Sequence, residues 1–379
     1  MRRTLPIGLL LSTDGTYRRM ARHALAGARD ALAEINADPQ LDFQLAATHC
    51  NPRGELSRYG EATAALMQQG VRHLFGTITS ASRKEIIPDL EQQGGLLWYG
   101  CPYEGFESSE SVLYLGACPN QTLVPLLRYA LATFGARGYL IGSNYVWGWE
   151  SNRIAREVLE LAGGRVLGEK YVHLGGTGFA EAIPTLMGQA PSFVLNNLVG
   201  ESSYAFLREL DAACAQAGIR LPVLSCNLTE AELGEVGERP NLRLLSCGPF
   251  FESVHAEFSR CQQLVHGLDR CSHYYTGAYV AVHAFAEALQ HTGSDAPEVI
   301  CDYLYRHPLP GVLGELRVSS RNNHSSLPCH IAELRAGRFE LLHSEAAALP
   351  ADPYLTATDL GAFQALRHEV PRQHLRIVK

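Results

Sequence analysis

The chain alternates short apolar runs with amphipathic helical patterns through most of its length. The apolar run at residues 5–11 precedes a helical pattern over residues 20–35, and this order recurs up to residue 115. After Pro119 the alternation restarts and continues to residues 242–247. Strands that alternate with helices form parallel sheets with helices on both faces. Two such blocks predict an α/β protein with two doubly wound, Rossmann-like lobes.

The last third of the chain has a different pattern. Three consecutive helices are predicted, at residues 253–267, 274–291 and 296–306. Strands are expected after them, at residues 311–318 and in a hairpin at residues 330–342. Since these helices have no strands of their own between them, we expect the chain to return to the first lobe and then cross back. Several crossings would form a hinge with a ligand cleft between the lobes.

This arrangement predicts the division of the chain. The N-terminal lobe is expected to contain residues 1–118 and 250–325. The C-terminal lobe is expected to contain residues 119–249 and 326–379. Each lobe would be large enough to bury a core of its own.

Composition and missing motifs exclude several functions. The formal charge is -7 and the 32 lysines and arginines form no long run, so we expect no direct nucleic-acid partner. No apolar stretch reaches the roughly 18–20 residues of a membrane span. The first strand is followed by Ser12-Thr-Asp-Gly15 rather than by a dinucleotide-binding glycine motif, and no P-loop is present. We therefore predict no cofactor and no enzymatic activity.

The cysteines and the N-terminus predict the compartment. None of the 10 cysteines forms a Cys-x-x-Cys pair or stands at zinc spacing from a histidine, so no metal site is predicted. Reduced, buried thiols explain them best. Residues 5–11 could begin a secretory signal, but Pro6 and Gly8 interrupt the run and Asp14 follows closely. We expect a cytoplasmic protein.

In a doubly wound sheet, ligands bind beyond the carboxyl ends of the strands. The segments that follow predicted strands are residues 76–80, 99–105, 143–149, 197–202 and 226–230. These segments are rich in hydroxyl, amide and aromatic side chains and poor in charge. They predict a pocket for a small, neutral, planar and polar ligand such as an amide, because burying a neutral group costs less desolvation than burying an ion.

Individual residues in these segments suit that ligand. Ser80 precedes a helix whose free backbone N–H groups could face an acceptor oxygen. Tyr99, Tyr145 and Trp147 offer flat walls with polar tips, and Asn197 and Asn227 can both donate and accept. Taken singly, each could instead be a structural residue.

Cys101 allows an alternative function. As a nucleophile it would make the protein an amide hydrolase, but no histidine lies near it in the sequence to activate it. A packing thiol or a pocket wall is the interpretation that we prefer for Cys101. The remaining choice is between a sensor and the solute-binding component of an ABC importer for amides or urea.

Six motifs occur together along nearly the whole chain. They are Gly76-x-x-x-Ser-x-x-Arg-Lys84, Tyr99-x-x-Pro-Tyr-Glu-Gly-Phe-Glu107, Pro119-Asn-Gln121, Ile141-Gly-Ser-Asn-Tyr145 with Glu150-Ser-Asn152, Arg321-Asn-Asn-His-Ser325 and Asp352-Pro-Tyr354. In this set the sequence resembles the AmiC-type amide receptors and their relatives that bind urea and short-chain amides.

The resemblance implies a type I periplasmic-binding-protein fold kept in the cytoplasm as a ligand sensor. Such receptors hold an antiterminator protein inactive and release it when an amide closes the cleft, so the implied role is negative regulation of an amidase or nitrile/amide operon. Homo-oligomerisation is left open. The implied ligand-contacting positions are Ser80, Tyr99, Cys101, Tyr145 and Trp147, with Asn197, Val199 and Asn227 from the other lobe.

The chain departs from the receptor pattern at the pocket wall. Ile78, Cys101, Asn144 and Trp147 stand where the receptors have Tyr, Thr, Asp and Tyr. A wall that has lost hydroxyl groups should bind acetamide less well, since part of its amide group would be left unpaired. We therefore expect a larger or more apolar ligand, such as an aromatic, branched or nitrile-derived amide.

Overall fold

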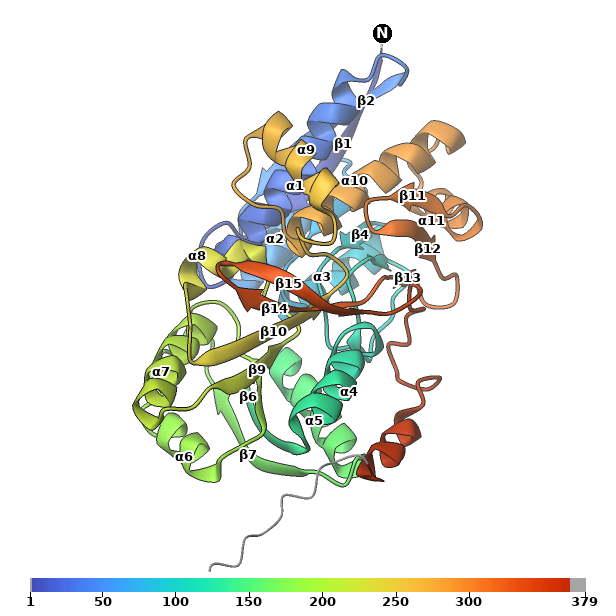
Figure 1. Ribbon diagram of the computed structural model, residues 1–379. Coiled ribbons are helices and arrows are strands. Elements are labelled where there is room, and N and C mark those ends of the chain that lie inside the picture. The colour runs from blue at the N-terminus through green and yellow to red at the C-terminus, as the bar shows by residue number, and fades with distance from the viewer. Residues whose placement is uncertain (1, 369–379) are drawn as a thin grey trace, which may run out of the picture.

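The computed structural model describes residues 2–368 and contains two lobes, each built on a parallel sheet (Figure 1). The first sheet has the strand order β2-β1-β3-β4-β5, and all its strands pair in parallel. Its strands are β1 (Arg3–Leu10), β2 (Phe43–Cys50), β3 (His73–Gly76), β4 (Leu96–Tyr99) and β5 (Val112–Tyr114). The α/β fold with two doubly wound lobes is confirmed.

The second sheet has the order β15-β14-β10-β9-β8-β6-β7. Its parallel strands are β6 (Arg137–Ser143), β7 (Arg165–Val172), β8 (Phe193–Asn197), β9 (Leu221–Ser225) and β10 (Leu242–Gly248). The hairpin of β14 (His330–Arg335) and β15 (Arg338–Ser344) adds to β10 in antiparallel orientation. A hairpin placed there extends the second sheet at the boundary between the lobes (Figure 1).

Helices cover both sheets. The first lobe has α1 (Arg18–Ala37), α2 (Leu56–Gln68), α3 (Ser80–Gln93), α9 (Ala256–His266), α10 (His273–Thr292) and α11 (Pro297–Arg306). The second has α4 (Leu123–Phe134), α5 (Val146–Leu161), α6 (Ala182–Gln189), α7 (Glu201–Ala217) and α8 (Leu233–Val236). Short 3₁₀ helices are η1 (Pro119–Gln121), η2 (Glu230–Glu232) and η3 (Leu360–His368). Among the described residues, no helix is both long enough and apolar enough to span a membrane.

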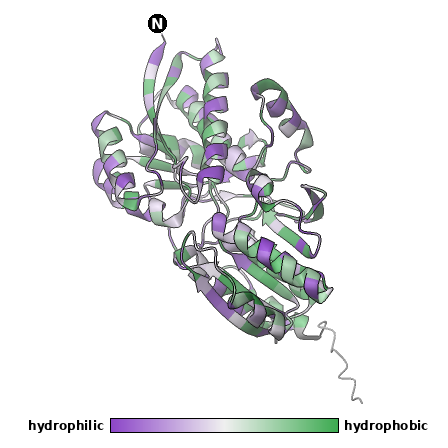
Figure 2. Ribbon diagram, turned by 90° about the vertical axis from the view of Figure 1, so that its left-hand side faces the viewer, coloured by the Kyte–Doolittle hydropathy of each residue, from purple (hydrophilic) through white to green (hydrophobic). Residues whose placement is uncertain are grey.

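The strands are apolar because they are covered on both faces. Ile7, Leu10, Leu74 and Leu97 in the first sheet are fully buried, as is usual for a parallel sheet between two helix layers. Figure 2 shows this pattern: helices carry both hydrophilic and hydrophobic colour, whereas the strands between them are mostly hydrophobic. Each lobe is therefore a layered unit with a sheet buried between helices.

Within residues 2–368 the chain passes between the lobes at three places. The passages lie between β5 and η1, between β10 and α9, and between the small sheet and β14. The small sheet consists of β11 (Leu309–Gly311), β12 (Gly314–Val318) and β13 (Ser325–Ser326). The predicted lobe boundaries stay a prediction, and their last residues, 369–379, lie outside the described part of the chain.

The starts of two helices position residues of the cleft. The α3 helix begins at Ser80 because the Thr79 side chain caps it by accepting a hydrogen bond from the Ser82 N–H at 3.1 Å. The α5 helix begins at Val146, which places Trp147 in its first turn. Gly148 allows this turn to lie against β6, since a Cβ there would stand 2.2 Å from the Ser143 carbonyl oxygen.

Candidate functional site

A small cavity of about 20 Å³ lies between the lobes, at the carboxyl ends of the parallel strands. It is lined by Tyr17, Met20, Ile78, Thr79, Ser80, Pro102, Tyr145, Trp147, Val199, Asn227 and Tyr274. None of these eleven residues carries a charged side chain. A cavity of this size has room for about one water molecule, so an amide needs more space than this conformation, in which the lobes are in contact, provides.

Ser80 connects the cavity to a buried ionic network. Its hydroxyl donates a hydrogen bond to a carboxylate oxygen of Glu104. Arg83, which is fully buried, contacts Glu104 at 3.4 Å and donates from Nε to Glu107 at 2.6 Å. Lys84 pairs with Glu107 as well. Because two cations face two carboxylates, the charges balance behind the cavity wall and leave the wall neutral.

The second lobe supplies the opposite wall. Tyr145 immediately precedes α5, and burial raises the pKa of its hydroxyl well above the usual range, so the hydroxyl stays protonated. Trp147 is buried and its indole Nε1 makes no hydrogen bond to any described residue. An unpaired buried donor costs free energy, which a ligand acceptor oxygen would recover.

Polar backbone contacts hold the remaining residues of this wall. Asn227 accepts from the Ser225 hydroxyl at 2.8 Å and donates to the Leu198 carbonyl at 3.4 Å. The Val199 N–H donates to the Ser143 hydroxyl at 3.2 Å. The loops after β8 and β9 are thus fixed in position and need little ordering when a ligand binds.

Five of the eight predicted residues line this cavity: Ser80, Tyr145, Trp147, Val199 and Asn227. Cys101 borders a neighbouring cavity of about 10 Å³ and donates from its thiol to the Thr77 carbonyl at 3.3 Å. Tyr99 and Asn197 are absent from the wall, because they are the last residues of β4 and β8 and are buried in the sheet layers.

The contacts of these two residues show where they point. The Tyr99 hydroxyl donates to the Ile78 carbonyl at 3.0 Å, and its ring lies 4.7 Å from the Arg83 guanidinium carbon. The Asn197 amide donates to the Asn152 side chain at 2.8 Å. Both therefore support the wall from behind in this conformation, and direct contact with a ligand stays a prediction.

Sequence reasoning missed Tyr17, Met20 and Tyr274, whereas Ile78, Thr79 and Pro102 lie in segments that it singled out. The signal for Tyr17 was present, since it follows Gly15 in the loop after β1 and that loop also ends at the carboxyl edge of the sheet. Tyr274 had no local signal, because α10 reaches the cleft only by returning to the first lobe. Its hydroxyl donates to the Asn227 carbonyl at 3.4 Å, which links the lobes.

The lobes also meet at the rim of the cleft. Arg18 and Arg19 in α1 form ion pairs with Glu201 in α7 and Glu235 in α8. Gly200 approaches the first lobe so closely that a Cβ would stand 2.3 Å from the Thr16 carbonyl oxygen. These contacts hold the closed arrangement.

Cys101, the candidate nucleophile, is a buried thiol beside a neighbouring cavity. Burial raises the pKa of the Cys101 thiol far above its usual range, which removes the thiolate that a nucleophile needs. Among residues 2–368, no group of three or more potential ligands is placed to hold a metal ion. The wall can donate hydrogen bonds to a small molecule and accept hydrogen bonds from it.

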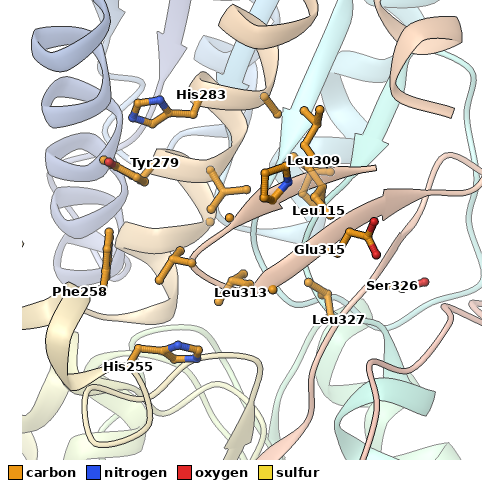
Figure 3. A pocket seen from close by; sticks show the side chains of 18 of the residues that line it. Leu115, His255, Phe258, Tyr279, His283, Leu309, Leu313, Glu315, Ser326 and Leu327 are labelled. Atoms are coloured by element: carbon orange, nitrogen blue, oxygen red, sulfur yellow. The ribbon is translucent and has the colours of Figure 1, made fainter. Parts of the chain in front are cut away.

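A cavity of about 630 Å³, larger than the one between the lobes, lies elsewhere (Figure 3). It is bordered by α9, α10 and the β11–β12 hairpin, and its apolar wall includes Phe258, Leu309 and Leu313. It contains none of the eight predicted residues. We therefore place the candidate site in the cleft between the lobes.

The comparisons with known proteins agree with this architecture. The sequence profile of the periplasmic binding protein domain family matches residues 5–359. The chain belongs to this family. Its solved structural neighbours share the fold over more than nine tenths of both chains at low sequence identity.

Three neighbours are solute-binding proteins of transporters. An ABC-transporter solute-binding protein of Rhodopseudomonas palustris HaA2, in complex with p-hydroxybenzoic acid, has a TM-score of 0.83 at 16% identity and covers 93% of this chain and 99% of its own. LivJ of Streptococcus pneumoniae, in complex with isoleucine, has a TM-score of 0.80 at 17% identity and covers 91% of this chain and 100% of its own. An ABC-transporter solute-binding protein of R. palustris, in complex with benzoate, has a TM-score of 0.79 at 15% identity and covers 92% of this chain and 98% of its own.

Proposed function

We propose that this protein binds a small, uncharged, amide-like solute in the cleft between its lobes and releases it chemically unchanged. The observation that carries the proposal is the neutral wall: eleven residues that offer hydroxyl, amide and indole groups but no charge. The unpaired Nε1 of Trp147 is a donor suited to a carbonyl oxygen.

The same wall disfavours a carboxylate ligand. The three neighbours described above are in complex with carboxylic acids or an amino acid. In this chain the two cations close behind the wall, Arg83 and Lys84, are engaged by Glu104 and Glu107. The Ser80 hydroxyl already donates to Glu104, so an incoming carboxylate would face a buried anion without a free cation to compensate it.

Transport is the role that the comparisons support best. The family and the neighbours favour a solute-binding component of an ABC importer. In such a protein the ligand shifts the equilibrium toward the closed form by its differential affinity for that form. The closed form would then be recognised by the importer.

Cytoplasmic sensing is the second candidate. It rests on the six motifs that resemble amide receptors and on the ten cysteines, eight of which are buried. In this role the same closure would release an antiterminator-type regulator and so control an amidase or nitrile/amide operon. The protein would then have no transporter partner.

The ligand class is tested by calorimetry and thermal shift with acetamide, benzamide, urea, benzoate and isoleucine. We expect benzamide to bind best and benzoate not to bind. A ligand at a hundredfold excess over its Kd stabilises the fold by about 2.7 kcal/mol, which a melting curve detects. Tighter binding of benzoate or isoleucine than of every amide would contradict the proposal.

The role of the Trp147 donor is tested with Trp147→Phe, which removes the N–H but keeps an aromatic wall. We expect the affinity for benzamide to fall about 10-fold, since one hydrogen bond to a buried group is lost. Trp149→Phe, at an exposed indole outside the cavity, is the matched control and should leave the affinity unchanged.

Cell fractionation with an intact-mass measurement then separates transport from sensing.

A further inference from the structure

His273, the first residue of α10, is a buried polar side chain without a partner. It is 3% exposed, and neither of its ring nitrogens makes a hydrogen bond with a described residue. Burial lowers its pKa to about 4, so the ring is neutral near pH 7 and carries one donor and one acceptor. Burying two ring nitrogens without hydrogen-bond partners costs free energy, so the structure needs a reason for this arrangement.

The ring borders another cavity of about 10 Å³ at the boundary between the lobes. It is distinct from the cavity beside Cys101 and is called the second cavity below. Its wall is mostly apolar and includes Leu228, Phe250 and Phe251. Phe250 and Phe251 belong to the passage between β10 and α9, one of the places where the chain crosses between lobes. A change in hinge angle therefore changes the size of this cavity.

The second cavity adjoins the candidate ligand cavity. Pro102 lines both of them. Asn227 and Tyr274 line the ligand cavity, whereas Leu228 and His273, their direct neighbours in the chain, line the second. The two cavities therefore lie next to each other, separated by these residues.

We propose that the second cavity is an inner subsite of the ligand cleft, and that His273 binds a second polar group at the far end of the ligand. This inference rests on the proposed function, since it assumes that the cleft binds an amide-like solute. Apolar residues such as Leu228, Phe250 and Phe251 line the second cavity, so its occupant should be apolar apart from the group that His273 binds. The ligand class is therefore an aromatic amide with a hydroxyl or similar donor–acceptor group opposite the amide.

The competing explanation is a single buried water molecule, for which each cavity is about the right size. A water on His273 would satisfy the ring equally well with any ligand in the outer cavity. A ligand-binding His273 instead discriminates between ligands with and without the second polar group. The two explanations therefore differ in ligand preference.

The test measures the Kd values of benzamide and 4-hydroxybenzamide by calorimetry with the full-length protein. We expect the wild-type protein to bind 4-hydroxybenzamide at least 10-fold more tightly than benzamide. His273→Phe should abolish this preference while changing the benzamide affinity less than threefold. His291→Phe, at an exposed histidine near the other end of α10, is the matched control and should keep the preference.

A second measurement does not depend on the folding of the phenylalanine variant. In ¹H–¹⁵N spectra of the histidine rings, 4-hydroxybenzamide should shift the His273 nitrogens and benzamide should not, with His273→Gln used for the assignment. Equal affinities for the two amides in the wild-type protein, or a preference that survives His273→Phe, would overturn the inference but leave the proposed function intact. Absence of binding by every amide would overturn both.

Discussion

At the scale of single residues, the lobe boundary contains carboxyl groups that burial keeps protonated. Glu230 is 3% exposed; one carboxyl oxygen accepts from the Glu252 N–H at 2.9 Å and the other has no partner. Its pKa is raised to about 8, chiefly by burial; hydrogen bonds to the backbone of Glu252 and Glu230 act in the opposite direction, as does the charge of Arg270, whereas the charge of Glu252 acts with burial. Burial likewise raises the pKa of Glu232 to about 7. Ionisation of either group therefore opposes folding.

The sign of the pH dependence follows from these values. An unfolded glutamate ionises near pH 4.5, whereas folded Glu230 stays protonated to about pH 8. Between these values the unfolded state binds fewer protons, so the stability falls as the pH rises. We expect Glu230→Gln to raise the melting temperature at pH 8.5 and leave it unchanged at pH 4. A larger gain at pH 4 than at pH 8.5 would contradict this assignment.

The Glu230→Gln variant keeps the carbonyl-type acceptor for the Glu252 N–H, so the change isolates ionisation. Glu235→Gln is the control, because this carboxylate lies nearby in α8 but is partly exposed and paired with Arg19. The Glu235→Gln variant should not show the same gain in melting temperature at high pH. Calorimetric scans from pH 4 to pH 9 measure both variants.

At the scale of elements, the first lobe depends on close packing of α1 against α10. Gly27 in α1 lies against α10 so closely that a Cβ would stand 2.1 Å from the Tyr275 carbonyl oxygen. Helices approach this closely only where a residue has no side chain. The contact fixes the position of α10 and, through it, of His273 and Tyr274 at the lobe boundary.

We expect Gly27→Ala to destabilise the protein by about 1–3 kcal/mol, because the helices must separate to accommodate the methyl group. Gly188→Ala in α6 is the matched control: its site is open, so it should stabilise by about 0.5–1 kcal/mol through helix propensity. Urea unfolding measures the free energy of unfolding of both variants. If Gly27→Ala were as harmless as Gly188→Ala, the close α1–α10 packing would be wrong.

At the scale of the whole molecule, two ion pairs join the lobes across the rim of the cleft. Arg18 pairs with Glu201 and Arg19 with Glu235. All four side chains are partly exposed, so each pair contributes little by itself. Because these pairs exist only when the lobes are together, they affect the closed form and not the folding of either lobe.

We expect the double variant Glu201→Gln/Glu235→Gln to weaken ligand binding about 2- to 10-fold, because closure loses both pairs. The effect should be lost at 1 M salt, where screening removes the attraction in the wild type as well. Glu315→Gln is the control, since its pair with Arg317 lies within β12 and does not cross between lobes. An equal loss of affinity in the control would contradict a role in closure.

The sequence by itself determined the layered architecture and much of the cleft wall. Alternating apolar runs and amphipathic helices can bury their apolar faces only as covered parallel sheets, and such sheets bring the loops after their strands to one edge. Ser80, Tyr145 and Asn227 were found in this way. The family resemblance added Val199.

Only the tertiary structure decided which residues face the cavity. Tyr99 and Asn197 end their strands, and a difference of one residue at a strand end turns a side chain from the cleft into the core. Tyr274 and His273 reach the boundary because α10 packs on α1, a contact between segments about 250 positions apart in the sequence. Local sequence patterns give the periodicity of each helix or strand, but they do not show which distant segment packs against it. Those distant segments supply the remaining residues of the site.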